Sequence, residues 1–114
     1  MRGSLPFRLL LALLTTGAVA MSSASAQQGT RSLKRGEALL TKNCARCHAT
    51  GTTGLSPHTG APPFRTLARK YPIDGLQEAL NEGLSVGHPD MPEFVFEPGE
   101  IGAILTYLKS IQER

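Results

Sequence analysis

The chain has 114 residues, with 12 Lys and Arg, 9 Asp and Glu, no Trp and a formal net charge of +3. Arg2 and Arg8 supply most of this excess, since 10 basic and 9 acidic side chains remain in the 88 residues from Gln27 to Arg114. A chain of this length holds one small domain, and a nearly neutral body without a long Lys/Arg run gives no indication of nucleic-acid binding.

The first 26 residues have the pattern of a Sec-type signal peptide. Arg2 and Arg8 form a positive segment, residues 9–20 form a short apolar run, and Ala24-Ser25-Ala26 is a small-x-small cleavage site. The apolar run is shorter than the ~20 residues that span a bilayer. An uncleaved anchor and cleavage after Ala20 are the alternatives. We therefore expect residues 1–26 to be a signal peptide and residues 27–114 to be a domain in the periplasm, without stable membrane insertion.

The domain is predicted to be all-α, and its first helix leads to the two cysteines. The stretch SLKRGEALLTKNC predicts a helix from Leu33, with Ser32 as its N-cap. Residues 49–63 read as a long loop, because glycine and proline interrupt any regular period. Residues 64–71 then read as a short helix that stops before Pro72.

Two further helices are expected in the second half of the chain. Residues 74–82 form one of them, with Asp74 and Gln77 in the pattern of a capping box and Gly83 as the C-terminal cap. A second long loop covers residues 84–97, and Pro98 suits the first turn of the last helix. The last helix has an apolar stripe at helical spacing: Ile101, Ile104, Leu105, Leu108 and Ile111. Long loops in a compact domain usually mean function or disorder, and these two loops are the expected places for a prosthetic group to be wrapped.

Residues 44–48 read CARCH and contain both cysteines of the chain. A CxxC pair also begins disulfides, thioredoxin-type dithiols and zinc half-sites. A thioredoxin-type dithiol lies near a βαβ pattern, and structural zinc needs four N/S ligands. This sequence offers no clear strand, and only His58 and His88 remain as further ligands, in separate loops. CxxCH is instead the pattern of c-type haem attachment, in which Cys44 and Cys47 form thioethers and His48 binds the iron.

We therefore predict one covalently bound haem c, whose apolar surface also helps to fill a small core. Met91 is the candidate for the second axial ligand, because it is the single methionine after residue 26 and lies between Pro89 and Pro92. Its thioether is a known axial ligand of haem iron. His88, His58 and an open position are the alternatives.

With these residues, the sequence resembles a class I cytochrome c, the monohaem His/Met type of small bacterial periplasmic proteins. The resemblance covers essentially all of residues 27–114, although position 40 is a leucine where the family often has an aromatic residue. It rests on Gly36 and Leu40 in the first helix, CARCH, GAPPF (60–64), DMP (90–92) and ILTYLKSI (104–111).

The resemblance implies the cytochrome c fold, with three to four helices around the haem and crossed first and last helices. Gly36 would let Tyr107 approach closely at the crossing. It also implies a hydrogen bond from the Nδ1–H of His48 to a backbone carbonyl of the proline loop, which we assign to Pro62.

The expected function is one-electron transfer between redox proteins that dock briefly, by a protein that is a monomer and not an enzyme. No carboxylate pair or nucleophile–base arrangement indicates catalytic residues. The alternatives are a haem sensor or small-ligand binder with a labile Met91, and a haem subunit of a larger oxidoreductase. Four basic residues are candidates for a docking patch near the haem edge: Arg46, Arg65, Arg69 and Lys70.

Overall fold

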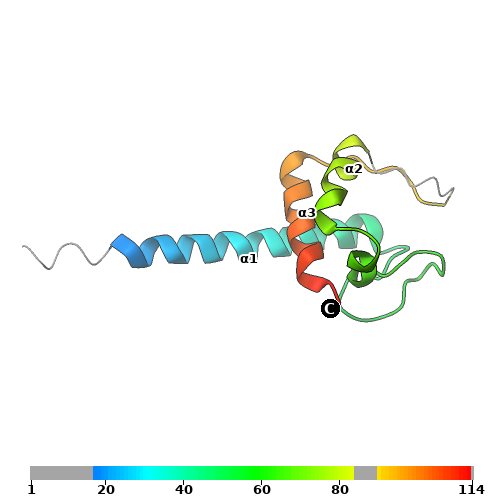
Figure 1. Ribbon diagram of the computed structural model, residues 1–114, viewed down its shortest axis with the longest axis horizontal. Helices are drawn as coiled ribbons and strands as arrows, with labels where there is room; N and C mark the ends of the chain where they lie inside the picture. The colour runs from blue at the N-terminus through cyan, green and yellow to red at the C-terminus, as the bar shows by residue number, and fades with distance from the viewer. Residues whose placement is uncertain (1–16, 84–89, 114) are drawn as a thin grey trace, which may run out of the picture.

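The computed structural model describes residues 17–83 and 90–113. Its elements are α1 (Gly17–Cys44), the 3-10 helices η1 (Phe64–Arg69) and η2 (Ile73–Gly75), α2 (Leu76–Glu82) and α3 (Pro98–Ile111). No strand occurs within these two stretches, and the all-α prediction is confirmed. In Figure 1, α1 follows the long axis, α3 crosses its C-terminal part and α2 lies beside α3.

The start of α1 differs from the prediction. The helix begins at Gly17, passes the predicted cleavage site between Ala26 and Gln27, and includes Ser32 as an interior residue rather than an N-cap. The sequence of residues 17–31 contains no proline and is rich in alanine, serine and glutamine, so nothing interrupts the helical hydrogen bonds. This part of α1 extends away from the other helices, and its side chains from residue 23 to residue 31 are exposed.

The crossing of α1 and α3 is the main packing contact of the fold. Gly36 is buried there, and an added Cβ would overlap the carbonyl oxygen of Ala103 and lie 2.8 Å from Cβ of Tyr107. Two helices can come this close only where one of them has no side chain. The crossing expected from the resemblance is therefore confirmed.

The core lies between this crossing and the shorter helices. All five residues of the predicted apolar stripe on α3 are buried, and Ile104 has no exposed surface. Helix α3 begins at Pro98, as predicted, and Glu97 and Glu100 form a capping box that satisfies the first backbone N–H groups. The other buried side chains of the core come from every helical element and from the segment before α3: Leu40, Phe64, Ile73, Leu80, Phe96 and Tyr107.

The predicted capping box at Asp74 is wrong. Residues 73–75 form the separate turn η2, Gly75 is the N-cap of α2, and no side chain caps that end. The Asp74 carboxylate pairs instead with Lys109 on α3, a contact that local sequence does not reveal. Gly83 ends α2 as predicted, with a φ of 93° that favours glycine.

Tyr107 links α3 to the loop that follows CARCH. Its hydroxyl donates a hydrogen bond of 3.0 Å to the carbonyl oxygen of Thr50. Burial raises the pKa of this phenol, and the negative charge of Glu37 adds to the rise. Helix α3 therefore packs against α1 at Gly36 and binds the start of the loop after CARCH through Tyr107. In residues 17–83 and 90–113, no helix is long and apolar enough to cross a membrane.

The crossing predicts opposite effects for two Gly→Ala substitutions. Gly36→Ala should lower the free energy of unfolding by about 3 kcal/mol, because the methyl group meets the backbone of α3. Gly102→Ala on α3 has no atom within 4 Å of the added Cβ and should raise stability by about 0.5–1 kcal/mol through helix propensity. Urea unfolding of the purified protein measures both. Equal effects of the two substitutions would contradict the close crossing.

The Tyr107 hydrogen bond predicts a stability difference that depends on pH. Tyr107→Phe should cost about 1 kcal/mol at neutral pH, because the Thr50 carbonyl loses its donor. The unfolded chain releases the phenol proton near pH 10, before the folded chain does, so the stability advantage of the wild type over the variant is complete below pH 10 and shrinks as pH rises further. Paired unfolding curves at neutral pH and above pH 10 test this, since both proteins share every other alkaline transition. A constant difference would contradict the assigned hydrogen bond.

Candidate haem-attachment site

The CARCH segment forms a tight turn at the end of α1. Cys44 is the last residue of the helix, and its carbonyl oxygen accepts hydrogen bonds from the N–H of Cys47 at 3.1 Å and of His48 at 2.9 Å. Both cysteines are free thiols and are half-buried, as is His48. The turn gathers the two sulfur atoms and the imidazole within one short segment.

The chemistry of Cys44 does not suit a reactive dithiol. Burial raises the pKa of its thiol to about 11, and the charge of Cys47 adds to the rise. Reactive redox cysteines have lowered pKa values, so that the thiolate is present at neutral pH. In the described parts of the chain, no group of three or more His, Cys, Asp and Glu is placed to hold a metal ion.

His48 is held by the proline loop and by Phe64. Its Nδ1 lies 2.8 Å from the carbonyl oxygen of Pro62, which is the contact that the resemblance implied. Since a carbonyl only accepts, Nδ1 carries the proton and Nε2 of the neutral ring keeps its lone pair. The Phe64 ring packs against the imidazole, with ring centroids 4.5 Å apart and an angle of 31° between the planes. The ring is thus oriented with a free metal-binding nitrogen.

The loop of residues 49–63 is bound to CARCH through His58 in its middle, and a hydrogen bond between Ala49 and Phe64 closes its two ends. The N–H of His58 donates to the carbonyl oxygen of Cys47 at 3.1 Å, and the N–H of Phe64 donates to that of Ala49 at 3.0 Å. Inside the loop, Ser56 Oγ accepts from the N–H of Ala49 at 3.0 Å. These bonds give a loop without regular structure a defined path past His48.

Met91 lies in the second loop and is half-buried. Its neighbour Asp90 contacts His58, with 3.5 Å between Oδ2 and Nε2, so the two loops meet one residue from Met91. His58 Nδ1 accepts from the N–H of Gly60 at 3.1 Å. His88, the other predicted alternative, lies outside the described residues. Cys44, Cys47, His48 and Pro62 therefore form one cluster, and Met91 is linked to it through Asp90 and His58.

Two of the four basic residues expected in a docking patch pair with one acidic side chain. Arg65 Nε and Arg69 Nη2 pair with the Glu113 carboxylate at 2.9 and 2.6 Å. The Arg46 and Lys70 side chains are exposed. Sequence reasoning missed Glu113 and its neighbour Gln112, because polar residues after the last apolar turn of a helix read as an unstructured end.

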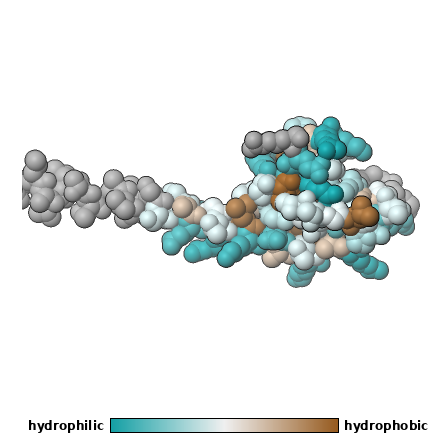
Figure 2. All heavy atoms as spheres, turned by 90° about the horizontal axis from the view of Figure 1, so that it is seen from below, coloured by the Kyte–Doolittle hydropathy of each residue, from teal (hydrophilic) through white to brown (hydrophobic). Residues whose placement is uncertain are grey.

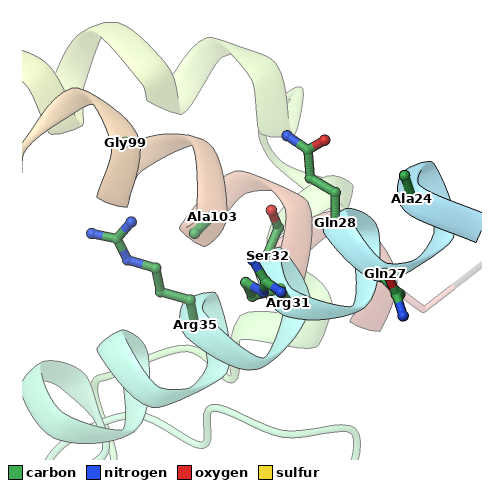
Figure 3. A pocket seen from close by; sticks show the side chains of 8 residues that line it. All are labelled: Ala24, Gln27, Gln28, Arg31, Ser32, Arg35, Gly99 and Ala103. Carbon is green, nitrogen blue, oxygen red and sulfur yellow. The ribbon is translucent and has the colours of Figure 1, made fainter.

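A separate groove of about 460 Å³ lies between α1 and α3, away from the site residues. Figure 3 shows Gln28, Arg31 and Arg35 of α1 beside Gly99 and Ala103 of α3. Ala24 also lines it, and this residue would be lost with the predicted signal peptide. The groove contains none of the predicted site residues.

The donor set suits haem c. Two free thiols are available for thioether bonds, and one imidazole has its Nε2 lone pair free and its Nδ1 proton engaged. Both features belong to a single turn and the loop that follows it.

Comparison with protein families identifies the family of this chain. The family model described as cytochrome C oxidase, cbb3-type, subunit III matches residues 31–108, which are 78 of the 114 residues. Comparison with curated proteins and with solved structures gives no match. The matched segment contains CARCH, Pro62, Met91 and most of α3. The chain therefore belongs to this family of monohaem c-type cytochrome domains and is a haem-based electron-transfer protein with the cytochrome c fold.

Proposed function

We propose that the protein is a periplasmic monohaem cytochrome that carries single electrons between redox partners, with His48 and Met91 as axial ligands. The observation that carries this proposal is the hydrogen bond of 2.8 Å between His48 Nδ1 and Pro62 O. It orients the ring and raises its basicity as a ligand, as is usual for metal-binding histidines.

The residues of the site have separate roles. The haem would supply an iron that carries one electron. Cys44 and Cys47 would hold it through thioethers at the end of α1, so that it could not leave between turnovers. His48 and Met91 would ligate the iron, which would limit rearrangement during each transfer and exclude other ligands. A methionine thioether together with an imidazole would favour the ferrous state relative to two imidazoles.

The assignment of Met91 is supported by the way its loop is anchored. Asp90 meets His58, and the His58 N–H binds the carbonyl oxygen of Cys47. A short path of contacts thus joins the Met91 loop to the attachment turn. His58 already contacts Gly60 and Asp90, which makes it a poorer candidate for the iron than Met91.

The surface supports brief docking rather than permanent assembly. On the face shown in Figure 2, apolar residues form separate spots among hydrophilic ones. Among the side chains that the structure describes, the large exposed apolar ones are Leu55, Tyr71 and Val95, two of them in the loops and one just after η1. Transient redox complexes use small interfaces, so a monomer with such a surface is adequate.

A second candidate is a haem subunit of a larger oxidoreductase, which the description of the matching family favours. Purification from the native membrane and soluble fractions distinguishes the two. A free carrier elutes alone from the soluble periplasmic fraction with Gln27 as its first residue, whereas a subunit co-purifies with a larger complex in constant ratio.

Haem attachment is expected to depend on both cysteines. The Cys44→Ser/Cys47→Ser double variant should lose its haem on a denaturing gel, whereas each single variant should keep it through one thioether. Arg46→Ala, an exposed position between the two cysteines, is the matched control and should keep the haem as the wild type does. Haem staining against total protein measures the outcome. Retention by the double variant would exclude thioether attachment.

Met91 is expected to close the distal position. The visible spectrum of the reduced wild type should not change when CO is added, and Met91→Ala should bind CO at once, because the iron loses its sixth ligand. His58→Ala and His88→Ala are the controls and should remain unreactive. If a histidine variant binds CO and Met91→Ala does not, the histidine replaced in that variant is the sixth ligand instead of Met91. A prompt CO shift in the wild type would favour a sensor or small-ligand binder.

A further inference from the structure

Gln112, the first residue after α3, connects the end of that helix to both ends of η1. Its Nε2 donates to the carbonyl oxygens of Phe64 at 2.8 Å and of Leu108 at 2.7 Å. Its Oε1 accepts from the N–H of Ala68 at 2.8 Å. The two bonds that Nε2 donates are partly buried and so have limited competition from water, whereas the bond from Ala68 is exposed.

The contacts require a primary amide of this length. Two carbonyl oxygens face the nitrogen and one N–H faces the oxygen, so each half of the amide meets its opposite. A carboxylate would place an oxygen against two carbonyl oxygens. Asparagine is one methylene shorter and would not reach both Phe64 and Ala68 from the same backbone position.

Phe64 carries this restraint directly to His48. Its ring packs on the imidazole with centroids 4.5 Å apart, and its N–H binds the carbonyl oxygen of Ala49, the residue after His48. Pro62, which accepts the His48 Nδ1–H, lies two residues before Phe64 with Pro63 between them. Because proline restricts φ, a displacement of Phe64 is passed to the Pro62 carbonyl with little relaxation.

The neighbouring ion pairs contribute less to this restraint. Glu113 pairs with Arg65 and Arg69, but these pairs hold the side chains that follow Phe64 and not the Phe64 carbonyl itself. The Glu113 N–H also binds the carbonyl oxygen of Arg65 at 2.8 Å, which keeps the chain end beside η1. The amide of Gln112 therefore restrains Phe64 from the end of α3, in addition to the bond between the Phe64 N–H and Ala49.

We propose that Gln112 is a positioning residue for the axial imidazole, which sets the strength of the hydrogen bond from His48 to Pro62 and thereby the reduction potential. This inference rests on the proposed role of His48 as a ligand. A strong Nδ1–H···O bond gives the imidazole more electron density and favours ferric iron. Loosening Phe64 weakens that bond, so loss of the Gln112 amide raises the potential.

The test compares two neutral variants of the haem-loaded protein. Gln112→Met keeps the length and removes all three hydrogen bonds without adding a charge. Ser110→Ala is the matched control, since its hydroxyl binds the carbonyl oxygen of Tyr107 at the same helix end and not residues 64–68. The reduction potential, the NMR resonances of the His48 ring and the hydrogen exchange of the Ala68 N–H are measured for both.

Gln112→Met should raise the potential, shift the His48 resonances and speed exchange at Ala68 at least tenfold, and Ser110→Ala should leave all three as in the wild type. Gln112→Glu, which keeps only the acceptor, should also shift the His48 resonances. A purely structural role would appear as a lower unfolding midpoint for Gln112→Met, with unchanged potential and His48 resonances, and would overturn the inference. If His48→Ala leaves the visible spectrum of the haem unchanged, His48 is not an axial ligand. That outcome overturns the proposed function and is distinct from a failure of the Gln112 inference alone.

Discussion

The close crossing of α1 and α3 at Gly36 is the contact on which the rest of the structure depends. It fixes where α1 ends, and Cys44 is the last residue of that helix. It also fixes α3, from which Tyr107 reaches Thr50 and Gln112 reaches η1. The same helix pair therefore positions both the CARCH turn and the loop that follows it. This close contact depends on the absence of a side chain at Gly36, because any Cβ at this position would separate the two backbones.

Around this helix pair, the site is built from backbone groups more than from side chains. Carbonyl oxygens of Cys44, Cys47, Ala49 and Pro62 accept the hydrogen bonds that shape the turn, the loop and the imidazole. Backbone acceptors of this kind tolerate changes of side chain along the loop. The residues proposed to carry chemistry are correspondingly few, and they are grouped in CARCH and in the loop that contains Met91.

The features that could be predicted from the sequence are those that local rules decide. Pro98 and the apolar stripe of α3 depend on residues within one or two turns, and CARCH carries its own spacing. Asp74 was predicted wrongly because Lys109, far along the chain, takes its carboxylate. The start of α1 was placed too late, since Ser32 has the right type for a cap but no break in the helix precedes it. The role of Gln112 could not be predicted either, because its hydrogen bond with Ala68 forms only where the end of α3 lies beside η1.

The crossing also bears on the order in which the molecule is completed. A chain emerges from its N-terminus, so CARCH is exposed before α3 has been made or delivered. Until α3 arrives, Gly36 has no partner, and neither Thr50 nor Phe64 has the contact that restrains it from that helix. The two thiols therefore belong to an unpacked segment until the last helix arrives. Under the proposed haem attachment, this is the interval in which the thioethers would form, and packing of α3 would end it.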